Sequence, residues 1–168
     1  MIEVEKESIM DYTAYINIIR DTLKKKIQLL DKLLEETLAQ EVIFSDEEVE
    51  IEEFEERLEK KEILIEQLNR LDDGFELVYE RFGMGIKENK LLYQEEISEL
   101  QNYIRQIIDK DVLLQAKEKI IKGKLEQYLS QKKLEVKNHK VSNQVLGNYY
   151  KNMLDGYQGE SIFLDKKK

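Results

Sequence analysis

The hydrophobic pattern from Ile51 to Ile86 is the clearest structural signal in the chain. Numbered in sevens from Ile51, two core positions recur at alternating spacings of three and four residues, and only an α-helix places such positions on one face. The first position holds Ile51, Leu58, Ile65, Asp72, Tyr79 and Ile86, and the second holds Phe54, Lys61, Leu68, Phe75 and Phe82. Leu64, Leu71 and Val78 widen the face, which favours a small bundle over a two-stranded coiled coil.

Two further amphipathic stretches predict helices on either side of this one. The first runs from about Asp11 to Gln40, and its core residues are Tyr12, Ile16, Ile19, Leu23, Ile27, Leu30 and Leu34, with Tyr15 and Leu33 beside them. Its opposite face is charged and is expected to be solvated: Lys24, Lys25, Asp31, Lys32 and Glu35. The other helix runs from about Glu88 to Lys137, with core residues Tyr93, Ile97, Leu100, Ile104, Ile107, Asp111, Leu114, Glu118, Ile121, Leu125 and Tyr128.

Turn and capping residues suggest where these helices end. Ser45 or Asp46 is a suitable N-cap for a second helix over residues 46–82, and Gly83-Met84-Gly85 is the plainest turn signal after it. The heptad continues beyond Gly74, so we expect the helix to pass through that glycine. The third helix would be about 75 Å long at 1.5 Å per residue, so it either overhangs the bundle or breaks near Asp109–Asp111 or Gly123.

Polar residues interrupt the core faces at four places, namely Lys61 and Asp72 in the second helix and Asp111 and Glu118 in the third. Buried polar residues can fix the register of packed helices, and this is the role we expect for Asp72 and Asp111. The interruptions in the third helix are also compatible with a bend there.

A short amphipathic segment follows a polar joint near the C-terminus. Residues 144–154 predict one short helix, half of whose circumference is apolar: Val145, Leu146, Tyr149, Tyr150, Met153 and Leu154. Tyrosine and methionine are common at interfaces, and short amphipathic helices often dock into grooves on partners. These six residues are therefore candidates for partner binding, although the segment could equally fold back onto its own bundle.

These patterns predict an all-α protein of long antiparallel helices, an elongated bundle or coiled-coil hairpin with a short C-terminal helix. Residues 1–142 would form the bundle and residues 143–168 the partner-binding segment. The chain has no proline and 38% charged residues, which fits long helices. It also has no cysteine, which fits a reducing cytosol. The N-terminus lacks the apolar core of a secretory signal, and no apolar run approaches a membrane span.

Charge is distributed unevenly, because residues 1–109 carry 14 basic and 29 acidic residues and residues 110–168 carry 13 basic and 7 acidic residues. A basic end can bind nucleic acid, but no arginine follows Arg105, so the usual base-reading side chain is missing there. A basic segment lying beside an acidic one is the simpler interpretation, and no nucleic-acid partner is expected.

Nothing in the sequence indicates catalysis, a metal site or a cofactor. His139 is the only histidine, so neither a catalytic pair nor the Glu-x-x-His pairs of a di-iron bundle can form. Gly83-Met84-Gly85 lacks the lysine and hydroxyl residue of a phosphate-binding loop. We therefore expect a protein that is not an enzyme.

Several stretches together resemble the FlgN family of flagellar export chaperones. They are the start at Asp11-Tyr12, Leu29-Leu30-Asp31-Lys32-Leu33-Leu34, the run from Glu66 to Phe75 with its Leu71-Asp72-Asp73-Gly74-Phe75, and the ending Tyr149-Tyr150-Lys151-Asn152-Met153 with Phe163-Leu164-Asp165-Lys166-Lys167-Lys168. The resemblance implies a cytoplasmic chaperone that binds the hook-associated proteins FlgK and FlgL, prevents their premature assembly and delivers them to the export apparatus. In that family the C-terminal amphipathic region carries much of the binding, which points to the same six residues.

Two other functions remain open from the sequence. The chain could be an elongated coiled-coil spacer in a larger assembly, or, more weakly, a nucleic-acid-binding helical protein. An exposed apolar face would also permit a homodimer.

Overall fold

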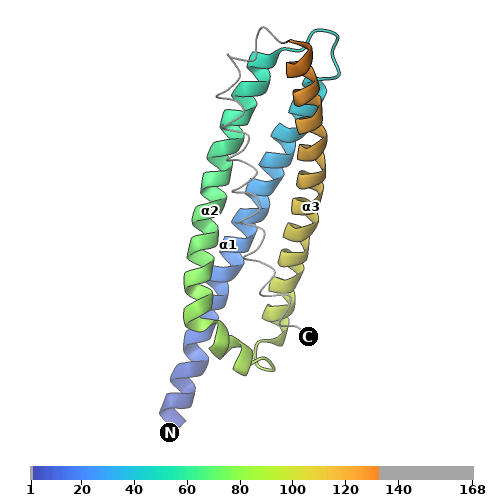
Figure 1. The fold of residues 1–168 in the computed structure, drawn as a ribbon. Helices are drawn as coiled ribbons and strands as arrows, with labels where there is room; N and C mark the ends of the chain where they lie inside the picture. The colour runs from blue at the N-terminus through green and yellow to red at the C-terminus, as the bar shows by residue number, and fades with distance from the viewer. Residues whose placement is uncertain (1, 133–168) are drawn as a thin grey trace.

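The structure is a computed structural model that describes the backbone of residues 2–132 and the side chains of residues 12–132. It contains three long α-helices, α1 (Ile2–Ile43), α2 (Ile51–Glu88) and α3 (Gln94–Gln131), joined by short connections (Figure 1). The predicted all-α fold of long antiparallel helices is therefore confirmed for this part of the chain.

Successive helices run in opposite directions, and α1 lies against both of the others (Figure 1). It packs against both α2 and α3, whereas no Cα atom of α2 lies within 8 Å of a Cα atom of α3. The backbones of α2 and α3 therefore do not form the close helix-to-helix packing that each makes with α1. They meet through side chains in the core, among them the Lys61–Glu118 ion pair.

The core consists of the residues that the heptad pattern predicts. None of the eleven heptad positions of α2 is exposed, and ten of the eleven predicted positions of α3 are fully buried, the exception being the half-buried Tyr128. The buried apolar residues fall into two clusters. The larger one has its centre on Leu23, Leu30, Ile65, Ile104 and Ile107. The smaller one is formed by Ile43, Phe54, Leu58, Ile121 and Leu125 near the α1–α2 connection.

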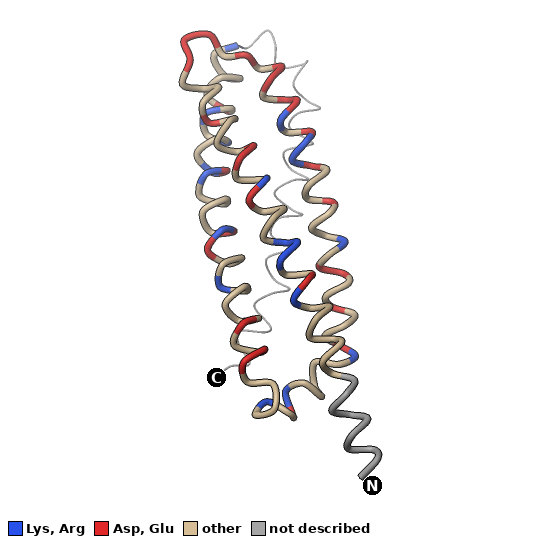
Figure 2. The backbone as a smooth tube through the Cα atoms, turned by 180° about the vertical axis from the view of Figure 1, so that it is seen from behind, with Lys and Arg blue, Asp and Glu red and all other residues tan. Residues whose placement is uncertain are grey.

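Ion pairs at the edges of the core link α1 to both neighbours. Glu36 pairs with Arg57 of α2 at 2.9 Å. Three pairs reach α3: Arg20 with Glu99 at 3.1 Å, Asp31 with Lys110 at 2.6 Å, and Glu41 with Lys117 at 3.0 Å. Basic and acidic residues both occur along all three helices, and acidic residues gather in the α1–α2 connection (Figure 2). Such partly exposed pairs contribute little individually.

The connection between α1 and α2 differs from the predicted N-cap at Ser45 or Asp46. Helix α2 begins at Ile51 with Glu50 at its N-cap position and no side-chain cap. Ser45 instead closes α1, because its backbone N–H donates to the Val42 carbonyl at 2.9 Å and its hydroxyl donates to the Glu41 carbonyl at 3.4 Å. Ser45 thus caps a helix, but at the C-terminal end of α1 and not at the start of α2.

The Gly83-Met84-Gly85 sequence was predicted to be a turn, and this prediction was wrong, since α2 continues to Glu88. These glycines make room for aromatic rings. A Cβ atom at Gly85 would overlap the ring and hydroxyl of Tyr12 from α1, and one at Gly83 would lie 2.8 Å from the Tyr79 ring. The chain turns afterwards, where the Asn89 side chain donates to the Gly85 carbonyl at 2.8 Å.

Two other predictions about helix continuity are settled by the structure. Helix α2 passes through Gly74 without interruption, as predicted. Helix α3 neither breaks nor ends at Asp109–Asp111 or Gly123, and at 38 residues it matches α2. Helix α1 starts at Ile2, earlier than the predicted start near Asp11. The predicted end of the third helix at Lys137 lies outside the described residues.

Candidate functional site

The residues predicted to bind a partner lie outside the described part of the chain. Val145, Leu146, Tyr149, Tyr150, Met153 and Leu154 all follow residue 132. The same holds for His139. The candidate features of the described residues are therefore two polar layers inside the core and one groove on its surface.

The first polar layer, here the Lys61 layer, contains Thr37 and Gln40 of α1, Lys61 of α2 and Glu118 of α3. All four residues have 0% exposure. The Lys61 ammonium donates to the Glu118 carboxylate and, at 2.6 Å, to the Gln40 side-chain carbonyl. The Gln40 amide in turn donates to the Phe54 carbonyl at 3.2 Å. One lysine thus links all three helices.

Thr37 completes the Lys61 layer. Its hydroxyl oxygen lies 2.6 Å from the Leu33 carbonyl oxygen and 3.1 Å from Glu118 Oε1, so its single proton can serve either acceptor. Burial lowers the pKa of Lys61, and the neighbouring Glu118 charge opposes that shift. Because the two charges in the layer are opposite and equal, the ion pair offsets much of the cost of burying them.

The second layer, here the Lys26 layer, contains Lys26 of α1, Asp72 of α2 and Asp111 of α3. Lys26 Nζ lies 2.7 Å from Asp72 Oδ1, and the two side chains are 4% and 17% exposed. Asp111 is 4% exposed. This layer therefore places two carboxyl groups near one lysine.

The excess of acid changes the titration of the Lys26 layer. Burial raises the pKa of Asp111 to about 6, and the Asp72 charge adds to this shift while Lys26 opposes it. Burial also raises the pKa of Asp72, with Lys26 again opposing. Sharing one cation between two buried acids leaves Asp111 partly protonated near neutral pH.

Both layers connect side chains from all three helices, so they specify which residues of one helix face which residues of another. This arrangement fits the register role predicted for Asp72 and Asp111. Helix α3 continues without a break through Asp111 and Glu118. The arrangement is a structural one, in which each acid lies near a lysine supplied by another helix.

The α1 members of the layers were missed by the sequence analysis. A series of spacings of three and four begins at Ile16 and continues through Ile19, Leu23, Lys26, Leu30, Leu33, Thr37 and Gln40. The apolar members of this series, Ile16, Ile19, Leu23, Leu30 and Leu33, were predicted correctly, whereas the predicted Ile27 and Leu34 are only half-buried. Lys26, Thr37 and Gln40 were missed because they are polar.

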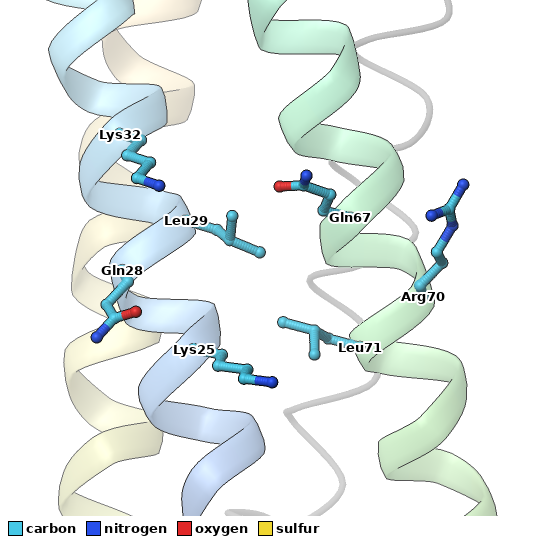
Figure 3. A pocket seen from close by; sticks show the side chains of 7 residues that line it. All are labelled: Lys25, Gln28, Leu29, Lys32, Gln67, Arg70 and Leu71. Carbon is cyan, nitrogen blue, oxygen red and sulfur yellow. The ribbon is translucent and has the colours of Figure 1, made fainter.

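A surface groove of about 330 Å³ lies between α1 and α2, on the side shown in Figure 3. Leu29 and Leu71 point into the gap from opposite helices, the Lys25 side chain points toward it from α1, and Lys32 lies over α1 beside it (Figure 3). Gln67 also points into the gap, Arg70 lies on the flank of α2, and Gln28 completes the lining.

The groove has a cationic rim and an apolar floor. Among residues 12–132, its lining includes three basic residues and no acidic one, and in the same range Lys25, Lys32 and Arg70 form no ion pair. Lys25 and Lys32 were predicted to lie on a solvated face. The helical pattern around them does not reveal the groove, because the α2 residues that complete the groove come from a different part of the sequence.

Comparisons with protein-family models, curated proteins and solved structures found no match to this chain. Between residues 2 and 132, no helix is long and apolar enough to cross a membrane. In the same range, no group of three or more histidine, cysteine, aspartate or glutamate residues is arranged to hold a metal ion.

Proposed function

We propose that this protein is a cytoplasmic export chaperone that binds the hook-associated proteins FlgK and FlgL, prevents their premature assembly and delivers them to the flagellar export apparatus. The proposal starts from the resemblance of the chain to the FlgN family. It requires no chemistry of bond making or breaking. Binding by mass action would keep the apolar helical ends of a client covered until export.

The observation that best supports a helix-binding role is the separation of α2 from α3. Both helices pack on α1, yet their own backbones do not approach each other within 8 Å. In a four-helix bundle, two helices on a diagonal are related in this way, and a fourth helix packs against both. The described helices thus have the arrangement of three members of such a bundle.

Two occupants could supply the fourth helix in this proposal, namely the amphipathic segment around residues 144–154 and an apolar helix of the client. We propose that the segment binds the client through Val145, Leu146, Tyr149, Tyr150, Met153 and Leu154, beside α2 and α3. Client and bundle would then together bury apolar surface that neither buries alone.

The test is co-purification of FlgK or FlgL with the full chain and with a chain ending at residue 142. We expect a stoichiometric complex with the full chain only, while circular dichroism shows that the truncated chain keeps most of its helical signal. A sharper variant replaces Tyr149, Tyr150, Met153 and Leu154 by alanine. Its matched control replaces Lys166, Lys167 and Lys168 by alanine, which should leave the complex intact.

Other outcomes would contradict the proposal. Equal binding by the full and truncated chains would remove the assigned role of the segment. Failure of both clients to bind, together with concentration-dependent self-assembly, would favour the coiled-coil spacer. Binding to DNA or RNA that weakens steeply with salt would favour a nucleic-acid-binding protein.

A further inference from the structure

The groove between α1 and α2 has the chemistry of a second binding site, separate from the C-terminal segment. We propose that it binds an acidic amphipathic helix of a protein partner, with two carboxylates seven residues apart and apolar residues between them. This proposal does not depend on the identity of the client, because it uses only residues of α1 and α2.

The spacing of the groove residues determines the pattern expected in the ligand. Lys25 and Lys32 are seven residues apart on α1, which corresponds to about 10.5 Å along a helix axis at 1.5 Å per residue. Leu29 lies between them, four residues after Lys25 and three before Lys32. Consider a ligand helix that lies along α1 and whose residues are numbered from j. Carboxylates at j and j+7 would then face Lys25 and Lys32, and apolar residues at j+3 and j+4 would contact Leu29 and Leu71.

The apolar floor favours a helix over a simple anion. Phosphate or a similar small ion would neutralise one lysine but would leave the two leucines in water. An amphipathic helix covers both kinds of surface at once, and helix-in-groove binding of this kind is a common mode of recognition. Arg70 on the α2 flank supplies a third cation for a further acidic residue at the rim.

Charge complementarity points to a partner instead of the chain's own C-terminus. Residues 133–168 contain seven lysines against four acidic residues, so this segment is basic overall and would be repelled by the groove. Among the described residues, Lys25, Lys32 and Arg70 line the groove without an acidic residue beside them. An acidic ligand would be attracted to this group of cations.

The experiment uses the full chain and fluorescently labelled helical peptides. The first probe has the pattern Glu-x-x-Leu-Leu-x-x-Glu, the second replaces both glutamates by lysine, and the third keeps the composition of the first but moves the glutamates to the opposite helix face. We expect the first probe to bind, with an affinity that decreases as salt is added. The other two should bind at least about tenfold more weakly, the factor expected from losing two ion pairs at the rim of a site.

Charge reversal in the protein provides the decisive comparison. The double variant Lys25→Glu/Lys32→Glu should bind the first probe about tenfold or more weakly than the unchanged chain does. It should bind the lysine probe more tightly. The matched control is Lys90→Glu/Lys119→Glu, which changes two exposed lysines outside the groove and should leave both affinities unchanged. All four substitutions lie on exposed positions, so the fold is expected to persist, and circular dichroism would verify this.

Three results would overturn the proposal. Equal weakening by the control variant would mean that the attraction is due to net charge alone. Equal binding of the first and third probes would mean that the groove does not recognise carboxylates and leucines together on one helix face. Complete competition by millimolar inorganic phosphate, or a charge-dependent homodimer that excludes the probe, would mean that the groove binds a small anion or a second copy of this chain.

Discussion

The two polar layers of the core differ in charge balance, and this difference has physical consequences. The Lys61 layer pairs one lysine with one glutamate and adds two neutral polar residues, all fully buried. The Lys26 layer places two aspartates near one lysine, and burial raises the pKa of both aspartates. The surplus acid of the Lys26 layer therefore makes stability depend on pH in the acidic to neutral range.

The layers also differ in their position relative to the apolar core. The Lys61 layer separates the larger apolar cluster from the smaller one around Phe54 and Ile121. The Lys26 layer lies at the level of Leu23, Leu30 and Ile107 within the larger cluster, where apolar packing continues on both sides. Disrupting the Lys61 layer should therefore loosen one end of the bundle, while disrupting the Lys26 layer should affect its middle.

Removing Lys61 should have the largest effect on stability. Lys61→Met removes the cation that faces the buried Glu118 carboxylate, and removing one member of a buried ion pair typically costs about 3–5 kcal/mol. Urea or thermal unfolding of the variant would measure this loss. The double variant Lys61→Met/Glu118→Leu should regain most of the stability, because replacing a whole buried pair by apolar residues is often neutral or stabilising. If the double variant were as unstable as the single one, the ion pair would not be the cause.

Removing Lys26 should cost less, about 2–3 kcal/mol, because Asp72 is partly exposed and both aspartates can take up a proton. Without the cation, the folded-state pKa of both acids rises further above the unfolded value. The destabilisation by Lys26→Met should therefore be greater at about pH 7.5 than at about pH 5. A loss that does not change with pH would contradict the assignment of two coupled acids to this layer.

Neutralising Asp111 should stabilise the protein at neutral pH. Its folded pKa of about 6 lies above its ordinary value of 3.8, so folding favours the protonated form, and stability is lost as the pH rises from about 4 to about 6. Asp111→Asn removes this loss and should raise the free energy of unfolding by about 1–2 kcal/mol at about pH 7.5, with almost no gain at about pH 4. The exposed Asp109→Asn is the matched control, and it should show no such pH-dependent gain.

The smallest effect concerns the neutral part of the Lys61 layer. Thr37→Val preserves the shape of the side chain but removes the hydroxyl that lies 3.1 Å from Glu118 Oε1. The expected loss is about 1 kcal/mol, the usual value for one hydrogen bond. A double-mutant cycle with Glu118→Gln would measure the coupling, and a coupling near zero would show that the hydroxyl serves the Leu33 carbonyl instead.

The sequence by itself determined the helices and most of the core. The heptad from Ile51 to Ile86 predicts the buried face of α2, and the corresponding pattern predicts the buried face of α3, because helical periodicity is a property of neighbouring residues in one segment. Helix ends were predicted less well. Ser45 serves α1 instead of α2, and the glycines at positions 83 and 85 accommodate the rings of Tyr79 and Tyr12 instead of making a turn.

Only the tertiary structure decided which polar residues meet. Lys26, Asp72 and Asp111 lie on three different helices, and so do Gln40, Lys61 and Glu118. Their grouping depends on how far each helix is shifted along its neighbours, which no single segment encodes. The groove also depends on the tertiary structure. In the sequence of α1, Lys25 and Lys32 lie on a solvated face, and they line a groove only because Gln67 and Leu71 of α2 pack beside them.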